Sequence, residues 1–313
     1  MPSEPLRIIF MGTPEFAVAS LQTLVESQAA GDLYQVVAVI TATDKPQGRG
    51  RKIAYSPVKE YALSQDIPVL QPPNLKSPAF LDELRGYEAD LQVVVAFRML
   101  PEVVWDMPRL GTFNLHASLL PQYRGAAPIN WAIINGETET GVTTFMIRHE
   151  IDTGSILFQE REPIHPDDTV GTLYERLMNK GAKLVLRTVQ AIAQDDSALA
   201  PQQEAAELKE APKLQRETAR IDWNQPAETI RNFVRGLSPY PAAWTMLGDK
   251  QYKLFRVTHT SESDTDLAPG EYATDNKTYL HIQAQDTRLA VEDLQPEGKR
   301  RLTIDEFLRG NSL

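Results

Sequence analysis

The residues of this chain that could carry chemistry gather in the stretch Phe113-Asn114-Leu115-His116, which Asp152 follows later in the sequence. Side chains of a strand alternate between its two faces, so Asn114 and His116 share one face while Phe113 and Leu115 face the core. An asparagine amide donates hydrogen bonds, and a histidine donates or exchanges a proton near neutral pH. The pair could therefore stabilise an oxygen that becomes negative during a reaction, and Asp152 could orient the imidazole or move the proton.

Each of these residues also has an ordinary structural explanation. Asn114 could end a strand, His116 could be a satisfied core histidine, and Asp152 could begin the turn before Gly154. The neighbouring runs Ser118-Leu119-Leu120-Pro121 and Arg124-Gly125-Ala126-Ala127-Pro128 make a catalytic site the better interpretation of the whole pattern. Ser118 lacks the Gly-x-Ser-x-Gly turn that exposes a nucleophilic serine, so we expect it to shape the loop.

Composition excludes several kinds of chemistry. The 313 residues contain no cysteine, and the five histidines show no metal-ligand spacing. Disulfides, thiolate nucleophiles and Cys-based zinc sites are therefore ruled out, and we expect neither a structural metal nor redox chemistry. The chain shows no basic and apolar leader pattern and no apolar run of membrane length. These features predict a soluble, cytosolic protein without a membrane partner.

Charge is unevenly distributed. The net charge is −10, which argues against indiscriminate binding of nucleic acid, because phosphate contacts require Lys and Arg. Residues 43–59 nevertheless hold one carboxylate, Asp44, against five cations, namely Lys45, Arg49, Arg51, Lys52 and Lys59. This segment predicts a local phosphate-binding site. The alternative is a solvated loop whose charges only aid solubility.

The order of apolar segments predicts an α/β fold. A buried strand at 6–11 breaks at Gly12 and leads into a helix, as in a parallel sheet. No second or third glycine follows Gly12 in the manner of a dinucleotide-binding turn, so a nicotinamide-linked dehydrogenase is disfavoured. Further strands are expected at 36–40, 91–96 and 113–116, and a pair at 143–147 and 156–158 flanks Asp152. A loop should span 41–56, with a helix from Pro57, another near Pro101, and a long amphipathic helix over 170–189.

The length and the composition predict two domains. We expect a catalytic domain over residues 1–193, a polar linker over 194–213 and a second domain over 214–313. In the second domain, a helix should begin at Pro226 and end at Leu237, and a capping box at 303–306 should start a last helix. Between them, short apolar runs separated by turn residues predict a small β-barrel, with strands at 243–247, 252–258, 270–273, 280–284 and 288–294.

At the Asn-x-His motif of residues 114–116, followed by Ser-Leu-Leu-Pro at 118–121 and Asp-Thr-Gly at 152–154, the sequence resembles the 10-formyltetrahydrofolate-dependent formyltransferases. The resemblance runs nearly end to end, through Phe-Met-Gly-Thr-Pro at 10–14, Thr-Asp-Lys-Pro at 43–46, Gly-Arg-Gly at 48–50 and Leu-Gln-Pro-Glu-Gly-Lys at 294–299. These flanking segments favour the branch that acts on initiator tRNA. The resemblance implies a Rossmann-like amino-terminal domain and a tRNA-binding carboxy-terminal barrel of the OB type.

The resemblance also implies a reaction, in which 10-formyltetrahydrofolate as co-substrate formylates the methionine amino group on initiator methionyl-tRNA. The amine attacks directly and forms a tetrahedral oxyanion, without a covalent enzyme intermediate. The family's catalytic Asn, His and Asp fall on Asn114, His116 and Asp152. Its folate-binding positions fall on Phe97, Ser118, Leu119, Leu120 and Pro121, and its tRNA-binding positions on Lys45, Arg49, Arg51 and Lys52.

Two positions depart from the family pattern. Arg98 replaces a small residue in the segment that lines the pterin pocket, and Glu150 stands where a glycine is frequent. We expect a monomer with folate and initiator tRNA as partners and no bound metal.

Two other functions fit part of the pattern. A small-amine formyltransferase, acting on a nucleotide-linked sugar amine or on glycinamide ribonucleotide, would use the same three residues but would not require the basic loop. A non-catalytic tRNA-binding or scaffolding protein would not require the three residues. Formate release from 10-formyltetrahydrofolate with and without charged tRNA would separate these cases.

Overall fold

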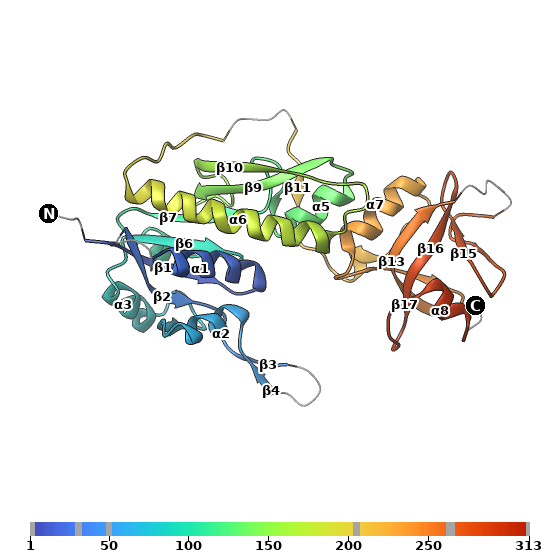
Figure 1. The fold of residues 1–313 in the computed structure, drawn as a ribbon, viewed down its shortest axis with the longest axis horizontal. Coiled ribbons are helices and arrows are strands. Elements are labelled where there is room, and N and C mark those ends of the chain that lie inside the picture. The colour runs from blue at the N-terminus through green and yellow to red at the C-terminus, as the bar shows by residue number, and fades with distance from the viewer. Residues whose placement is uncertain (1–3, 29–32, 48–51, 203–206, 261–266, 311–313) are drawn as a thin grey trace. The chain divides into compact units, whose positions relative to one another are not determined.

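The structure is a computed structural model, and it describes residues 4–28, 33–47, 52–202, 207–260 and 267–310 (Figure 1). The chain falls into two compact units. The first comprises Met1–Arg124, Gly141–Glu162 and Glu175–Lys209, and the second comprises Gly125–Thr140, Pro163–Tyr174 and Glu210–Leu313. Two segments that precede residue 175 therefore pack with the carboxy-terminal residues.

A mixed sheet forms the centre of the first unit, and its described part has seven strands. The strand order is β10 (Ile156–Pro163), β9 (Glu139–Met146), β7 (Thr112–His116), β6 (Leu91–Val95), β1 (Leu6–Gly12), β2 (Tyr34–Ile40) and β5 (Val69–Leu70). The strands from β7 to β5 run parallel, and β9 runs antiparallel to β7. This arrangement confirms the predicted Rossmann-like α/β fold.

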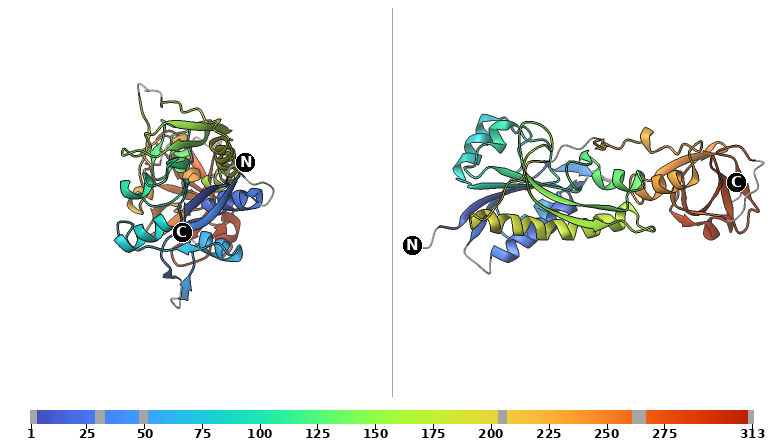
Figure 2. Two further views of the ribbon diagram at one scale, coloured as in Figure 1. Left: turned by 90° about the vertical axis from the view of Figure 1, so that its left-hand side faces the viewer. Right: turned by 90° about the horizontal axis from the view of Figure 1, so that it is seen from above.

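Helices cover both faces of this sheet, which explains why its central strands are continuous apolar runs instead of alternating ones. Helices α1 (Glu15–Gln28) and α6 (Val170–Ala193) lie on one face (Figure 2). On the other face, Phe80 and Leu84 of α3 (Pro78–Gly86) and Val104 of α4 (Glu102–Trp105) join the core formed by the strands.

The packing of α6 fixes which way the side chains of β7 point. Gly181 of α6 lies so close to Leu115 that an added Cβ would be 2.7 Å from the Leu115 Cδ2 atom. Leu115 therefore faces α6, and alternation directs Asn114 and His116 to the opposite face, as predicted. The sheet thus separates the apolar anchor of β7 from its polar side chains.

The loop expected over residues 41–56 contains a short hairpin, β3 (Lys45–Gln47) and β4 (Lys52–Ala54). Helix α2 (Pro57–Ser64) follows, and the Ser56 hydroxyl caps it by accepting a hydrogen bond from the Lys59 backbone N–H at 3.1 Å. The short elements that the sequence pattern does not predict include β5, α3 and α5 (Pro128–Ile134).

The second unit contains an antiparallel sheet with the character of a half-barrel, consistent with the predicted OB-like domain. The strand order is β12 (Ala243–Leu247), β13 (Lys250–His259), β16 (Arg288–Pro296), β15 (Leu280–Gln283) and β14 (Tyr272–Thr274), and β17 (Leu302–Thr303) also pairs with β16. The predicted capping box is present, because Thr303 and Glu306 exchange hydrogen bonds at the start of α8 (Ile304–Leu308).

Helix α7 (Ala227–Leu237) packs on this sheet, and its apolar stripe enters the core through residues such as Ile230 and Val234. Pro226 occupies the N-cap position of α7 and not its first helical position, and Pro101 occupies the N-cap position of α4. Both prolines mark helix starts as expected, each one residue before the first helical position.

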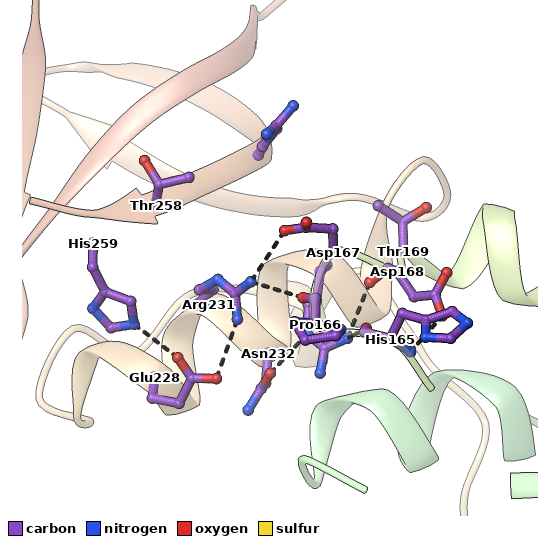
Figure 3. Close-up of polar contacts among 12 residues, drawn as sticks. His165, Pro166, Asp167, Asp168, Thr169, Glu228, Arg231, Asn232, Thr258 and His259 are labelled. Carbon is purple, nitrogen blue, oxygen red and sulfur yellow. Dashed lines mark hydrogen bonds and ion pairs between the residues drawn. The ribbon is translucent and has the colours of Figure 1, made fainter. Parts of the chain in front are cut away.

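The same unit includes α5 and the 163–174 segment, and both contact α7. The Asn130 amide of α5 donates to the Gly236 carbonyl at 2.8 Å. Figure 3 shows Arg231 between Glu228 and the 166–167 turn, where its guanidinium donates to the Pro166 carbonyl at 2.7 Å and pairs with Asp167. Arginine side chains of α7 thus satisfy backbone carbonyls of a turn that has no regular structure of its own.

The remaining short elements lie between the larger ones. They are β8 (Arg124–Gly125), which pairs with β11 (Glu210–Ala211), and a 3₁₀ turn over Glu217–Ala219. Strand β11 falls within the expected linker, so part of that linker is ordered backbone.

Candidate active site

The polar end of β7 places two of the predicted catalytic side chains beside the third. The His116 Nδ1 atom lies 3.8 Å from the Asp152 Oδ2 atom, and both side chains are largely buried. This distance is too long for a hydrogen bond between the two atoms, although the groups face each other. His116 Nε2 lies 2.8 Å from the Tyr123 carbonyl oxygen. A carbonyl oxygen only accepts, so Nε2 carries the proton and Nδ1 faces Asp152.

Asn114 is the half-buried member of the same strand face. Within the described part of the chain its carboxamide has no hydrogen-bond partner. Its backbone is held on both sides, opposite Val94 of β6 and Phe145 of β9. A rigid backbone and an uncommitted amide are what a hydrogen-bond donor for a developing negative charge requires.

The loop after β7 includes the cis peptide bond Leu120–Pro121, and an inner network centred on Thr143 holds it. The Thr143 hydroxyl donates to the Ser118 carbonyl at 2.6 Å and accepts from the Leu120 N–H at 3.2 Å. The Gln159 amide donates to the Leu120 carbonyl at 2.8 Å. Because these hydrogen bonds engage the backbone at both Ser118 and Leu120, they fix the loop in a single arrangement.

Ser118 and Leu119 hold the same loop with their side chains. The buried Ser118 hydroxyl donates to the Gln122 carbonyl at 2.6 Å, which closes the loop on itself. Leu119 lies against Gly141, where a Cβ would stand 2.5 Å from its Cδ2 atom. The hydroxyl of Ser118 is thus engaged in holding the loop, as its predicted shaping role requires.

The Asp152 loop depends on a glycine. Asp152 has a backbone φ of 55°, in the left-handed region that aspartate tolerates better than most residues. Two residues later, a Cβ on Gly154 would stand 1.6 Å from the Met146 carbonyl oxygen. Only glycine lets the loop return this closely along β9. The Asp-Thr-Gly sequence therefore serves the backbone path that brings Asp152 to His116.

The residues expected at the pterin pocket follow β6, at the same edge of the sheet as the end of β7. Phe97 is half-buried and packs on the core, and its neighbour Ala96 has a positive φ of 47°. The Arg98 guanidinium lies 5.6 Å from the Phe97 ring and donates to the carbonyl oxygens of Pro72 and Pro73. These contacts explain how the chain accommodates an arginine there.

Glu150, the second departure from the family pattern, lies in the Asp152 loop. It is exposed, and its carbonyl accepts a hydrogen bond from the Thr153 hydroxyl at 3.1 Å. The structure thus places this carboxylate at the surface of the loop, while Asp152 is largely buried.

Of the four predicted tRNA-binding cations, Arg49 and Arg51 lie outside the described residues. Lys45 begins β3 and is exposed, and Lys52 begins β4. Lys59 forms an ion pair with Asp44 at 2.6 Å. Asp44 is the one carboxylate in residues 43–59, so its charge is balanced by Lys59 and the sequence supplies no second carboxylate there for the other four cations. Hydrogen bonds from Gln71 and Lys59 lower the pKa of Asp44. This cluster ties the base of the hairpin to α2.

In the described residues, no three His, Asp or Glu side chains gather as a metal site would require. Nor does the described part of the chain contain a helix that is both long and apolar enough to cross a bilayer.

Sequence reasoning missed several residues that hold the site. Thr143, Gln159 and Tyr123 support the loop after His116, and Gln202 donates to the Asp152 loop. None of them stands in a local pattern that signals this role, because each acts on a segment distant in sequence or through its backbone. The Arg-Gly motif at 124–125 was the nearest signal, since the Arg124 guanidinium donates to Gln202.

Two protein-family models together match most of the chain. A family model described as formyl transferase matches residues 6–189, and one described as formyl transferase, C-terminal domain, matches residues 213–312. Among curated proteins, the chain is 55% identical to a methionyl-tRNA formyltransferase of Bacteroides fragilis, over 99% of this chain and 96% of that protein. It is 49% identical to the protein of the same name from Flavobacterium johnsoniae, over 98% of this chain and 96% of that one.

Solved structures share the fold at lower identity. The sugar 3N-formyltransferase WlaRD, whose structure was determined with dTDP and 5-N-formyl-THF, superposes with a TM-score of 0.67 at 21% identity, covering 94% of this chain and 99% of that one. HypX from Aquifex aeolicus in complex with tetrahydrofolic acid gives a TM-score of 0.61 at 20% identity, covering 95% of this chain and 46% of that one.

Proposed function

Because the chain belongs to the formyl transferase family, we propose that it transfers the formyl group of 10-formyltetrahydrofolate to the methionine amino group of initiator methionyl-tRNA. The product, N-formylmethionyl-tRNA, serves translation initiation. The observation that carries the proposal is the Asn114 carboxamide, which has no hydrogen-bond partner among the described residues and lies on the strand face that also presents His116 to Asp152. Relatives named methionyl-tRNA formyltransferase match the chain over nearly its whole length, which supports the choice of tRNA as the acceptor.

In the proposed reaction, the neutral amine of the aminoacyl group attacks the formyl carbon and forms a tetrahedral oxyanion. Asn114 donates to that oxygen from a strand that is fixed on both sides, so its dipole needs no reorganisation. No enzyme nucleophile is required, because the amine is itself one. This agrees with Ser118, whose hydroxyl is engaged within its own loop.

The two ring nitrogens of His116 take different tasks. Nε2 is committed to the Tyr123 carbonyl, so Nδ1 is the atom that can reach the reaction. Nδ1 donates to an oxyanion only when the ring is protonated, and the Asp152 carboxylate would stabilise that imidazolium. Asp152 helps to take the proton from the attacking amine and to return one to the N10 leaving group, directly or through water.

We assign the folate site to Phe97 and to residues 118–121. The half-buried Phe97 ring supplies an apolar surface for a pterin, and the fixed backbone of the 118–121 loop supplies hydrogen-bonding groups of constant geometry. A folate formyl donor is also in keeping with the family and with the tetrahydrofolate complex of the neighbouring HypX structure. We also propose that the donor carries its formyl group on N10 of the folate.

We assign tRNA contacts to Lys45, Arg49, Arg51 and Lys52 in the first unit, and to the carboxy-terminal domain, which follows the catalytic residues 1–193 and the linker 194–213. A pocket of about 660 Å³ in the second unit supports the latter assignment. It is lined by the cations Lys213, Arg216 and Lys253 and by the aromatic residues Tyr240 and Trp244. Cations beside aromatic rings suit a phosphate backbone with stacked bases.

The acceptor can be tested by measuring turnover of 10-formyltetrahydrofolate with charged initiator tRNA, with uncharged tRNA and with small amines. Of these three acceptors, we expect only the charged initiator tRNA to give rapid turnover of 10-formyltetrahydrofolate. Turnover with a nucleotide-linked sugar amine or glycinamide ribonucleotide, and none with charged tRNA, would replace the proposal with a small-amine function. Binding of tRNA without any turnover would favour a scaffold.

A further inference from the structure

Residues 200–202, which fall in the expected linker, are bound to the catalytic unit. Ala200 pairs with Ile156 at the start of β10, through an N–H···O distance of 2.7 Å in one direction and 2.9 Å in the other. This pairing places Gln202 beside the Asp152 loop. The segment therefore has a defined position next to the candidate catalytic residues, which a flexible connection would not give it.

The Gln202 side chain joins three partners. Its Nε2 atom donates to the Asp152 carbonyl at 2.7 Å and to the Gly154 carbonyl at 2.9 Å. Its Oε1 atom accepts from the Arg124 Nη2 atom at 2.5 Å. The two carbonyls can only accept and the guanidinium can only donate, so the orientation of the amide is fixed. Both amide protons are used on the Asp152 loop.

This contact acts at a point where the backbone needs support. Asp152 has a positive φ, Gly154 passes at close range along β9, and the Asp152 carboxylate stands 3.8 Å from His116. Holding the Asp152 carbonyl fixes the backbone from which the Asp152 carboxylate projects towards His116. We propose that Gln202 is a positioning residue, which fixes the Asp152 carboxylate relative to His116.

The inference rests on the proposed function, because it assumes that Asp152 handles protons. The partners of this side chain require a donor for two carbonyls and an acceptor for a guanidinium, and a glutamine amide provides both. Glutamate has the same shape but would direct an anionic oxygen at two carbonyl oxygens. Methionine has a similar length and offers no donor. Either replacement should release the loop while leaving the Ala200 backbone pairing in place.

The first test is turnover of Gln202→Glu and Gln202→Met with 10-formyltetrahydrofolate and charged initiator tRNA. A displacement of about 1 Å at a catalytic group can lower the rate about 100-fold, so we expect kcat to fall between about 10-fold and about 100-fold in both variants. The KM for the formyl donor should be unchanged, because the three hydrogen-bond partners of the Gln202 side chain named above lie outside the assigned folate site. Unchanged kcat in either folded variant would overturn the inference.

The sequence offers a matched control in Gln122. Its amide donates to the Glu207 carbonyl at 3.0 Å, and its side-chain carbonyl accepts from the Lys209 N–H at 2.9 Å. It therefore holds residues 207–209 of the expected linker, and within the described residues its side chain makes no hydrogen bond to the Asp152 loop. Gln122→Glu should keep kcat near that of the parent protein. A loss equal to that of Gln202→Glu would mean that fixing the segment is what matters, and would overturn the positioning role.

A double-mutant cycle with Asp152→Asn gives a readout that general destabilisation would not. If Gln202 acts through the carboxylate, adding Gln202→Met to Asp152→Asn should lower kcat no further. A full additional loss would overturn the inference and leave the proposed function intact. Full turnover of Asp152→Asn alone would instead contradict the role of Asp152, and with it the role of Gln202.

Discussion

The two ring nitrogens of His116 have different surroundings, because one is hydrogen-bonded to a backbone carbonyl and the other faces Asp152. The Tyr123 carbonyl fixes the proton on Nε2, and the same contact turns Nδ1 towards Asp152. The distance of 3.8 Å between Nδ1 and Oδ2 is longer than a hydrogen bond, so neither atom is committed to the other. The pair is therefore arranged to act on a substrate between or beside them, which makes Asp152 the most informative single residue to change.

We predict that Asp152→Asn lowers turnover by about 100-fold or more, because the amide cannot accept a proton or stabilise the imidazolium. Asparagine adopts the left-handed backbone conformation as readily as aspartate, so the fold should survive. His116→Ala should cause a loss of the same order. Steady-state kinetics beside a thermal unfolding curve would check both. A well-folded Asp152→Asn protein with full activity would remove Asp152 from the mechanism.

Asn114→Ala should lower kcat much more than it weakens folate binding. A donor directed at a developing oxyanion acts mainly in the transition state, and one such donor typically contributes about 100-fold to about 1000-fold. Fluorescence titration with a folate analogue gives the ground-state affinity, and single-turnover kinetics give the chemical step. Equal losses in the two quantities would show that Asn114 binds substrate uniformly.

Ser118→Ala should retain the reaction. Its hydroxyl is buried and donates to the Gln122 carbonyl, so the substitution should reduce stability by about 1 kcal/mol through the lost hydrogen bond. Denaturant unfolding measures the loss of stability, and the turnover assay measures what remains of the reaction. Complete inactivation of a folded Ser118→Ala protein would favour a covalent route through this serine.

For single residues, the sequence predicts the properties that depend only on neighbours along the chain. Alternation alone predicts that Asn114 and His116 share a face, because that property is local to one strand. It cannot reveal Tyr123 or Gln202, which act on His116 and Asp152 through tertiary contacts. The approach of Asp152 to His116 follows only from chemical need and from family resemblance, since no local pattern determines how a loop returns to a strand.

Among the elements, the loop between β9 and β10 is the one most constrained by its backbone. Gly154→Ala should displace this loop, because the new Cβ would stand 1.6 Å from the Met146 carbonyl oxygen, which cannot move aside. We predict a fall in turnover of about 10-fold or more, since the loop carries Asp152. Gly86→Ala in α3 is a suitable comparison, because a Cβ added there would meet nothing within 4 Å.

The two glycine variants can be compared by kinetics and by thermal unfolding. Gly86→Ala should keep the turnover and the melting temperature of the parent protein. If Gly154→Ala behaved in the same way, the loop would have more room than its geometry indicates, and the Asp-Thr-Gly sequence would need another explanation.

The predictability of the elements follows their length and burial. The strands β1, β2 and β6 are predictable because buried parallel strands appear as continuous apolar runs. The hairpin of β3 and β4 lies where the sequence predicts only a loop, because each strand has three residues and is too short to show an apolar periodicity. Short elements such as α5 are defined by their contacts with α7, which are distant in sequence.

For the whole molecule, the property that matters is a local concentration of positive charge in a chain whose net charge is −10. Replacing Arg49 and Lys52 together with Ala should weaken tRNA binding and reduce the salt dependence of the affinity by up to about two phosphate contacts. Folate binding should stay unchanged. Affinities measured over a range of salt concentrations would test this.

An unchanged tRNA affinity and an unchanged salt slope in the Arg49 and Lys52 double variant would indicate a solvated loop, and would favour a small amine as the acceptor.

The division of the chain into two compact units is only partly predictable. The composition of residues 194–213 indicates a boundary, whereas the packing of residues 125–140 and 163–174 with the carboxy-terminal residues depends on contacts such as that of Arg231 with Pro166.

Transfer of a formyl group from folate to methionyl-tRNA can be followed directly. The most direct measurement supplies 10-formyltetrahydrofolate carrying an isotopic label in its formyl group, together with charged initiator tRNA, and identifies the labelled product by mass spectrometry after nuclease digestion. We predict that the label appears on the methionine amino group with the purified protein and falls by about 100-fold or more with Asp152→Asn. Label found only as free formate, or none on methionine with the parent protein, would contradict formyl transfer to methionyl-tRNA.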